Sequence, residues 1–317
     1  MLQTTGQKTL KSAVNCHGIG VHSGLAANLT IKPGEKNTGF VFVRTDVTDK
    51  NNIIAGLWDH VTETRLCTVL SNKDGVTIST VEHVLSALAA CGIDNAVLEI
   101  DGPEMPIMDG SAKDFLTMID RAGIAEQDAP KRYIMVKKPV LFEEDGKTVT
   151  LMPSLHPEWH MEIDFDSAAI GRQKFRFDNS EKSYRRDIAD CRTFGFLHEV
   201  EMLQKMGLAR GGSLDNAIVI DGDSVLNPGG LRHGDEFVRH KILDAIGDLV
   251  LAGAPLLADY YGDKAGHAVN NKILHALFAD KSAFEFISAN RLALLKQQHE
   301  KAAPRPAKQE KDEALRV

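Results

Sequence analysis

Short runs of alternating apolar and polar residues occupy much of the first third of the chain and predict β-strands. Residues 25–31 and 39–44 are two such runs, and the turn-forming Pro33-Gly34-Glu35 separates them. Helical spacing of apolar residues follows at 80–91 and 109–122, with a further strand expected at 96–100 between them. This mixture of strands and helices is typical of an α+β domain.

The same pattern returns after the polar stretch 125–130, which ends in Pro130 and predicts a domain boundary. Strands are expected at residues 133–136, 140–142, 148–152, 161–165 and 173–177, and helices at 185–189, 199–205, 236–252 and 268–278. We therefore predict two related α+β domains, residues 1–127 and 131–298, that face each other. Residues 299–317 are charged and contain proline, so we expect a disordered tail.

The most informative polar pattern lies in the helix expected from Glu236. Its apolar side comprises Val238, Ile242, Leu243, Ile246, Leu249 and Val250, and its polar side comprises His240, Lys241, Asp244 and Asp248. A solvated stripe is the ordinary interpretation of such a polar side. However, His240 and Asp244 are four residues apart and share one face, so an imidazole and a carboxylate can bind one metal ion there.

A third ligand is available upstream, where Glu82 precedes His83. Two histidines and one aspartate leave one open position on a tetrahedral metal, and a spare carboxylate beside a ligand suits a hydrolase. Each residue also has a structural interpretation. Ser79 and Glu82 fit a capping box, and His83 alone would most often be a surface histidine.

Three further segments carry candidate chemistry. His267 opens a predicted helix, where Asp248 would stabilise its cation, although a simple turn histidine fits equally well. The glycine-rich stretch 18–24 lacks both the GxGxxG and the P-loop spacing, so we interpret it as a tight turn whose His22 lines a site. Thr193 offers a hydroxyl beside Phe194, with core packing as the alternative.

Composition narrows the class of protein. The formal net charge of the 317 residues is −7, which argues against nonspecific nucleic-acid binding, and 43% hydrophobic residues are ordinary for a soluble domain. No signal peptide or membrane span is expected. The four cysteines form no CxxC pair, which disfavours a disulfide framework or a structural zinc knuckle and favours reduced cytosolic thiols.

Several segments together resemble the UDP-3-O-acyl-N-acetylglucosamine deacetylase (LpxC) family, in order from about Gln7 to Phe286. They are Ser79-Thr80-Val81-Glu82-His83, Met105-Pro106-Ile107-Met108-Asp109-Gly110-Ser111, Arg192-Thr193-Phe194-Gly195-Phe196, the stretch from His240 to Asp248, and Gly266-His267-Ala268-Val269-Asn270-Asn271-Lys272. The resemblance implies two α+β sandwich domains with the active site between them, each carrying a small insert. The second insert would shape an apolar passage for an acyl chain, and we expect it within residues 161–177.

The resemblance also implies the reaction, which removes the N-acetyl group of UDP-3-O-acyl-N-acetylglucosamine in the committed step of lipid A synthesis. The enzyme would be cytoplasmic, occur in Gram-negative bacteria and, we expect, be a monomer. The site residues carried over have distinct roles. The metal ligands would be His83, His240 and Asp244, which would bind Zn²⁺, with Fe²⁺ as the alternative ion. Glu82 would be the general base, Thr193 would hold the oxyanion, and His267, oriented by Asp248, would be the cationic acid. The substrate would contact Lys241, Phe194 and His22, with Lys241 at its phosphates.

Two other functions fit the same ligands. A His-His-Asp set also occurs in non-haem Fe(II) oxygenases, although these usually draw a His-x-Asp/Glu pair from a β-barrel. A nucleotide-sugar binding module with a structural metal would need a fourth protein ligand, for which Cys67 is the candidate.

Overall fold

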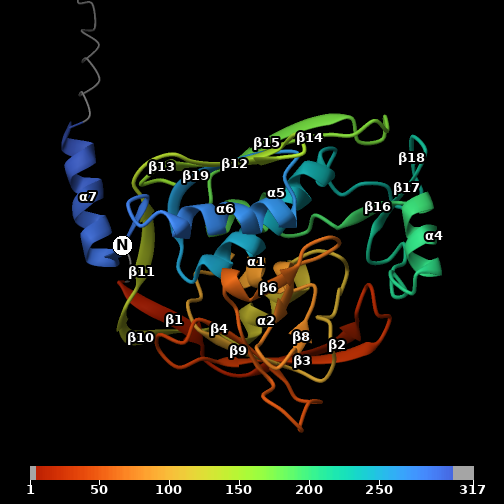
Figure 1. Cartoon of the computed structure of the whole chain (residues 1–317), viewed down its shortest axis with the longest axis horizontal. Helices are drawn as coiled ribbons and strands as arrows, with labels where there is room; N and C mark the ends of the chain where they lie inside the picture. Colours follow the sequence, from red (N-terminus) through yellow and green to blue (C-terminus); the bar gives the residue numbers. More distant parts are fainter. Residues whose placement is uncertain (1–4, 303–317) are drawn as a thin grey trace, which may run out of the picture.

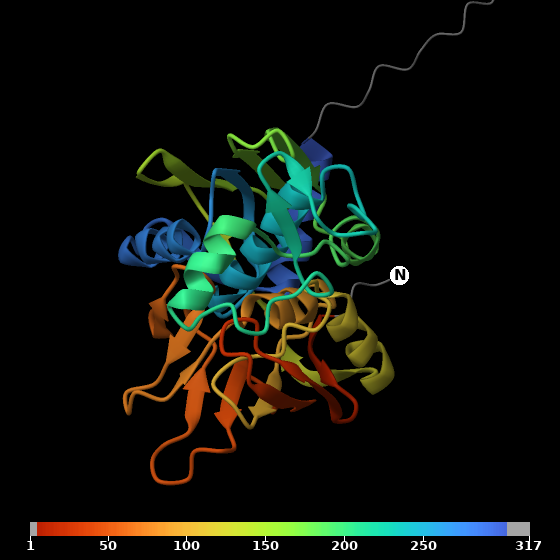
Figure 2. The same ribbon diagram turned by 90° about the vertical axis from the view of Figure 1, so that its right-hand side faces the viewer.

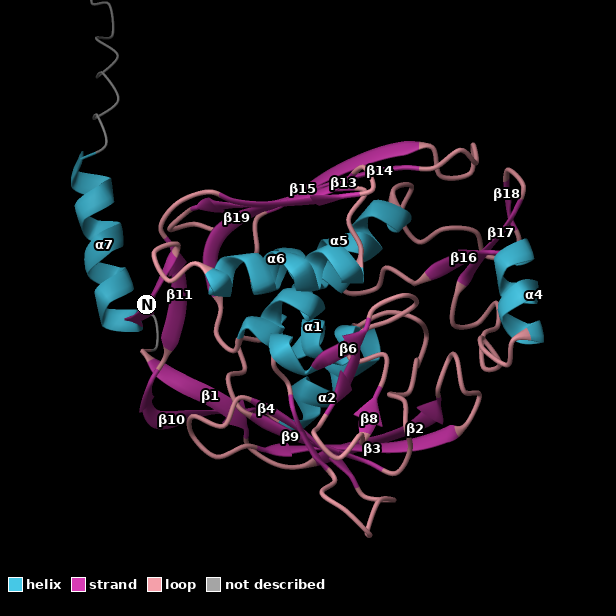
Figure 3. Cartoon of the chain, viewed as in Figure 1, coloured by secondary structure: helices cyan, strands magenta, loops and turns pink. Residues whose placement is uncertain are grey.

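The computed structural model describes residues 5–302. Two sheets, one from each half of the chain, form the outer layers, and helices from both halves lie between them (Figures 1 and 3). The architecture is α+β, as the alternation of strand and helix patterns predicts. No helix among residues 5–302 combines the length and apolarity needed to cross a bilayer.

The sheet of the first half has five strands in the order β2-β3-β9-β4-β5, and only the β4–β9 pair is parallel. Its strands are β2 (Val14–Ile19), β3 (Ala26–Pro33), β9 (Ala96–Ile100), β4 (Phe40–Arg44) and β5 (Ile53–Ala55). A short 3-10 helix, η1 (Trp58–His60), leads into a separate small sheet of β6 (Val61–Glu63), β7 (Val69–Ser71) and β8 (Thr77–Ile78). Helices α1 (Glu82–Ala90) and α2 (Lys113–Ala122) complete this half.

The sheet of the second half has seven strands. They are β11 (Arg132–Val136), β12 (Val140–Glu144), β13 (Lys147–Pro153), β14 (Trp159–Asp164), β15 (Arg172–Phe177), β19 (Leu256–Asp263) and β20 (Phe284–Ser288). Its helices are α3 (Glu181–Asp187), α5 (Glu236–Leu249) with the short η2 (Val250–Ala252), α6 (His267–Ala279) and α7 (Ala289–Ala302).

The polar stretch 125–130, where a domain boundary is predicted, has regular secondary structure. It forms β10 (Ile124–Pro130), which pairs antiparallel with β1 (Gly6–Leu10) at the start of the chain. The backbone hydrogen bonds of this segment are therefore made with a strand that is distant in sequence, and the local residue pattern does not predict that pairing. We propose that the boundary between the two domains lies just after this ribbon, near Lys131.

The expected position of the second insert, residues 161–177, is wrong. These residues form most of β14 and β15, which belong to the seven-stranded sheet through the parallel pairing of β14 with β19. The element outside that sheet is a separate unit of β16 (Phe194–Phe196), α4 (Leu197–Lys205), β17 (Ile218–Asp221) and β18 (Ser224–Val225). Seen from the side, α4 lies in front of the junction between the two halves (Figure 2).

The tail begins later than its composition predicts. Helix α7 extends to residue 302, so the expectation of disorder is wrong for residues 299–302. Residues 303–317 lie outside the described part of the chain.

The centre of the molecule is the contact between α1 and α5, one helix from each half. Gly247 of α5 lies against the backbone of Glu82, and a Cβ atom added at Gly247 would be 2.0 Å from the Glu82 carbonyl oxygen. The predicted apolar side of α5 is buried, as Ile242 and Leu243 show. On its polar side, His240, Asp244 and Asp248 are buried as well, because α1 covers them, whereas Lys241 is partly exposed.

Candidate active site

Three ligand-type side chains converge where α1 meets α5. His83 lies in the first turn of α1, and His240 and Asp244 lie one turn apart on α5. The Oδ1 atom of Asp244 is 3.2 Å from Nε2 of His240 and 3.6 Å from Nε2 of His83. All three residues are no more than 4% exposed. The structure thus brings together the two ligands predicted from helix spacing and the third from the other half.

Hydrogen bonds hold these atoms in a form that fits a divalent metal ion. Nδ1 of His240 is 3.0 Å from the carbonyl oxygen of Cys191, which can only accept, so Nδ1 donates this bond and Nε2 is the ring atom available to a metal ion. Oδ2 of Asp244 accepts from Lys241 at 2.7 Å, which leaves Oδ1 directed at both imidazoles. Convergent donor atoms of this type bind zinc and similar ions.

Protonation favours the same conclusion. Burial opposes ionisation of Asp244, but His240 and Lys241 together hold its pKa well below the usual range. The pKa of His83 is lowered, chiefly by burial, so its imidazole is neutral. A carboxylate and a neutral imidazole are the forms that bind metals.

Within residues 5–302, the group contains three protein ligands and no fourth. Cys67 is buried but is not part of it, and burial, reinforced by Glu82, raises the pKa of its thiol to about 12. The described residues therefore leave a coordination position open, which is characteristic of catalytic rather than structural zinc sites.

Glu82 lies beside the ligands without joining them. Its Oε2 accepts a hydrogen bond from the backbone N–H of Thr68 at 3.2 Å, and its Oε1 is 3.8 Å from Nε2 of His267. Burial raises the pKa of Glu82 to about 7, against the opposing effect of His267. The capping-box interpretation is wrong, because the Ser79 hydroxyl binds the carbonyl of Pro103 instead.

His267 is the first residue of α6, and its Nδ1 is 2.8 Å from Oδ2 of Asp248. Burial lowers the pKa of His267, but Asp248 and Glu82 more than offset this and raise it to about 9. The imidazole is therefore cationic at neutral pH. The contact expected between Asp248 and His267 is present.

Two residues that contact Asp248 were not predicted from the sequence to belong to the site. Asn270 donates to Oδ2 of Asp248 at 2.9 Å, and the Thr68 hydroxyl donates to Oδ1 at 2.6 Å. Asn270 lies three residues after His267, and this helical spacing could have identified it. Thr68 has no such signal, because it is far from Asp248 in sequence.

Thr193 and Phe194 lie next to the ligands. The carbonyl of Cys191 binds His240, and the ring of Phe194 packs edge-on at 6.4 Å from the ring of His240. Thr193 stands between them in the chain, and the described residues give its hydroxyl no hydrogen-bond partner. The ammonium of Lys241 lies 5.6 Å from the centre of the Phe194 ring. Roles for these residues toward substrate stay predictions.

His22 occupies the predicted tight turn, which is closed by a hydrogen bond from the N–H of Gly24 to the carbonyl of Gly20. Burial lowers the pKa of His22, with Glu104 opposing and His267 adding to the effect. Its Nδ1 is buried and has no hydrogen-bond partner within residues 5–302. A contact of His22 with substrate remains a prediction.

Comparison with known proteins agrees with this geometry. Residues 7–279 match the model of the LpxC family, described as UDP-3-O-acyl N-acetylglycosamine deacetylase. A curated UDP-3-O-acyl-N-acetylglucosamine deacetylase from Phenylobacterium zucineum (strain HLK1) is 52% identical over 278 residues, which cover 88% of this chain and 95% of the relative. The chain that places His83, His240 and Asp244 beside Glu82 and His267 therefore belongs to the LpxC deacetylase family.

Proposed function

We propose that this chain hydrolyses the N-acetyl group of UDP-3-O-acyl-N-acetylglucosamine, giving the free amine and acetate for lipid A synthesis. The observation that carries the proposal is the placement of Glu82 and His267 beside a three-ligand metal group, in a member of this family. From the family resemblance we also propose Zn²⁺ as the ion, a cytoplasmic location and a monomer.

His83, His240 and Asp244 would hold the ion. When bound, Zn²⁺ would supply Lewis acidity toward the acetamide carbonyl and would lower the pKa of water in the open position. Glu82 would accept a proton from the attacking water, because its carboxyl is buried, adjacent to a ligand and has a pKa of about 7. A general base of this kind contributes about 10²–10⁴ in rate.

His267 would act as the general acid. Its cation, held by Asp248, would stabilise negative charge developing on the substrate and then give its proton to the departing nitrogen as the C–N bond breaks. Thr68 and Asn270 fix Asp248, so the imidazolium is held in one orientation. The hydroxyl of Thr193 would add a hydrogen bond to the oxyanion.

The remaining contacts concern binding. Lys241 is positively charged and partly exposed beside Phe194, which suits a phosphate oxygen. The unit of β16 to β18 and α4 exposes the apolar side chains of Met202 and Met206. We propose that this unit, rather than residues 161–177, accommodates the acyl chain.

The two other functions receive less support. A structural metal site would need a closed set of four ligands, and the described residues supply three. An oxygenase triad does not need an additional acid and base, whereas here the carboxyl of Glu82 and the imidazolium of His267 lie 3.8 Å apart. These two groups suit hydrolysis, which needs a base and an acid.

The test compares metal content and acetate release in purified variants. Glu82→Gln should keep one equivalent of zinc and lose about 10²–10⁴ of the rate, and His267→Ala should also keep zinc. His240→Ala should lose the metal and the activity together. The exposed Glu285→Gln is the matched control and should change neither. Metal loss in Glu82→Gln, or oxygen consumption by the wild type, would contradict the proposal.

A further inference from the structure

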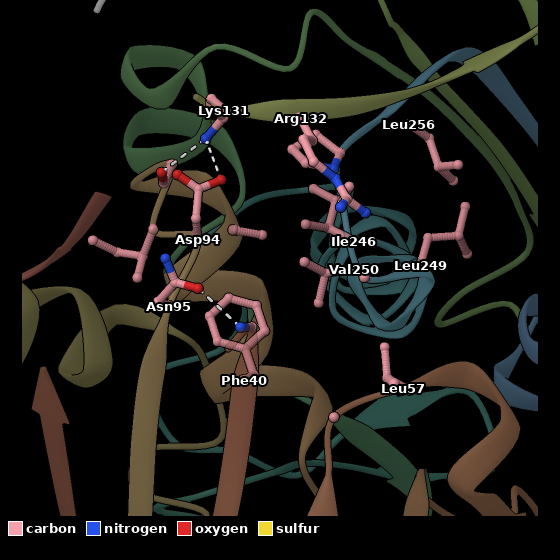
Figure 4. Close-up of a pocket in the computed structure, with 18 of the residues that line it drawn as sticks. Phe40, Leu57, Asp94, Asn95, Lys131, Arg132, Ile246, Leu249, Val250 and Leu256 are labelled. Carbon is pink, nitrogen blue, oxygen red and sulfur yellow. Dashed lines mark hydrogen bonds and ion pairs between the residues drawn. The ribbon is translucent and has the colours of Figure 1, made fainter. Parts of the chain in front are cut away.

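A cavity lined by residues of both halves lies beside the α5 helix. It encloses about 320 Å³, which is within the range of small-molecule sites. Much of its lining is apolar and comes from both halves, including Phe40, Leu57, Leu249, Val250 and Leu256 (Figure 4). None of the residues assigned to metal binding or catalysis lines it.

Only some of the charged residues that line this cavity form ion pairs. Lys131 forms an ion pair with Asp94 at 2.9 Å, so these two charges satisfy each other. Arg132 is exposed to solvent at the cavity and pairs with no carboxylate within residues 5–302; its guanidinium packs against the Phe286 ring, 4.9 Å from its centre. In Figure 4 the side chain of Arg132 points toward the middle of the cavity. The lining therefore carries one positive charge that no carboxylate there neutralises.

A second donor is also unused. Trp159 lines the same cavity, and its indole N–H is buried without an acceptor in the described part of the chain. Leaving a buried donor unpaired is energetically unfavourable. The buried indole N–H lacks an acceptor, the exposed guanidinium can exchange water for an anionic acceptor, and the surrounding apolar side chains suit an apolar body.

We propose that this cavity binds an organic carboxylate with an apolar chain or ring system. The carboxylate would accept from Arg132, and the apolar part would lie against Leu57, Leu249 and Leu256. Such a ligand touches both halves of the protein at once. It would therefore stabilise their association and raise the melting temperature, by an amount that grows with the logarithm of its free concentration above Kd.

The cavity is placed to communicate with the active site through two helices. Ala89 lines it at the C-terminal end of α1, whose first turn carries Glu82 and His83. Val250 lines it just beyond the end of α5, which carries His240 and Asp244. On α5, Ile246 and Leu249 line the cavity while Asp244 and Asp248 belong to the active site, so the two sites lie on opposite sides of this helix.

Fluorescence gives a direct test, because the chain has only two tryptophans. Trp58→Phe leaves Trp159 as the single emitter in the zinc-loaded protein. We expect ω-bromodecanoate to quench Trp159 on contact and to raise the melting temperature, and ω-bromodecanol to bind at least about tenfold more weakly because it lacks the charge. Bromonaphthoate distinguishes an aromatic from an aliphatic ligand, and quenching by either acid supports the proposal.

Variants separate this cavity from any other apolar site. Arg132→Gln should weaken quenching by the acid about tenfold or more, and Leu57→Asp at the exposed rim should do the same by repulsion. Arg121→Gln changes an exposed arginine outside the cavity and should bind as the parent does. Absence of quenching by both acids, equal binding of acid and alcohol, or unchanged binding by Arg132→Gln would overturn the proposal.

Discussion

Nδ1 of His267 lies 2.8 Å from Oδ2 of Asp248, and both oxygens of that carboxylate also accept other hydrogen bonds. Thr68 binds one oxygen, and Asn270 binds the other. Asp248 is therefore fixed in place beside the imidazole. It supplies most of the charge that keeps His267 protonated in a buried position.

Replacing Asp248 by Asn should lower both the pKa of His267 and the rate. The side chain keeps its size, but one of the two accepting oxygens becomes an NH2 donor, so it cannot accept from both Thr68 and Asn270, which contact different oxygens. We expect kcat/KM near neutral pH to fall about tenfold or more, with zinc content unchanged. Asp49→Asn, an exposed change, serves as the control. Wild-type kcat/KM in Asp248→Asn would show that the carboxylate does not support catalysis.

The pH profile of kcat/KM should be bell-shaped. A general base acts when deprotonated, so the rate should rise as pH increases through the pKa of Glu82, about 7. A bound cation would favour the carboxylate and shift this limb to lower pH. A general acid acts when protonated, so the rate should fall above the pKa of His267, about 9. In the zinc-loaded enzyme, His267→Ala should lose the decrease in kcat/KM at alkaline pH. If that decrease persists in the variant, it arises from another group.

Gly247→Ala should destabilise the protein. Its Cβ would lie 2.0 Å from the carbonyl oxygen of Glu82, so α1 and α5 must move apart. Overpacking of this kind costs about 1–3 kcal/mol, which denaturant unfolding can measure. The matched control is Gly234→Ala, where an added Cβ meets nothing within 4 Å. Equal stability of the two variants would mean that the helices tolerate separation.

A buried hydrogen bond joins the two halves behind the site. The hydroxyls of Ser86 on α1 and Tyr184 on α3 are 2.7 Å apart, and both residues are almost completely buried. Tyr184→Phe leaves Ser86 unpaired and should cost about 1–3 kcal/mol. Adding Ser86→Ala should cost less than the sum of the single changes. Strict additivity in thermal or denaturant unfolding would exclude a coupling through this bond.

Local rules predicted the parts of the site that lie within one helix. His240 and Asp244 share a face because they are four residues apart, and this holds in any helix. The same rule left the polar side of α5 with two interpretations, solvated stripe or site. The structure excludes a solvated stripe, because α1 from the other half covers His240, Asp244 and Asp248.

Strand pairing between distant segments determines features of the fold that local sequence patterns do not predict. Residues 161–177 have strand character whether they form an insert or part of the main sheet, and only the pairing of β14 with β19 places them in the sheet. Thr68 illustrates the same limit for the site. Its contacts with Glu82 and Asp248 join segments that are distant in sequence, and no periodicity relates them.

The ligands come from both halves, with His83 on α1 and His240 and Asp244 on α5. An ion held by all three would close a loop of roughly 160 residues, in the manner of a removable cross-link. Its binding free energy would then contribute to the association of the two halves as well as to chemistry. Removing the ion would loosen that association in the same step that ends turnover, so metal supply would set both the activity and the lifetime of the folded enzyme.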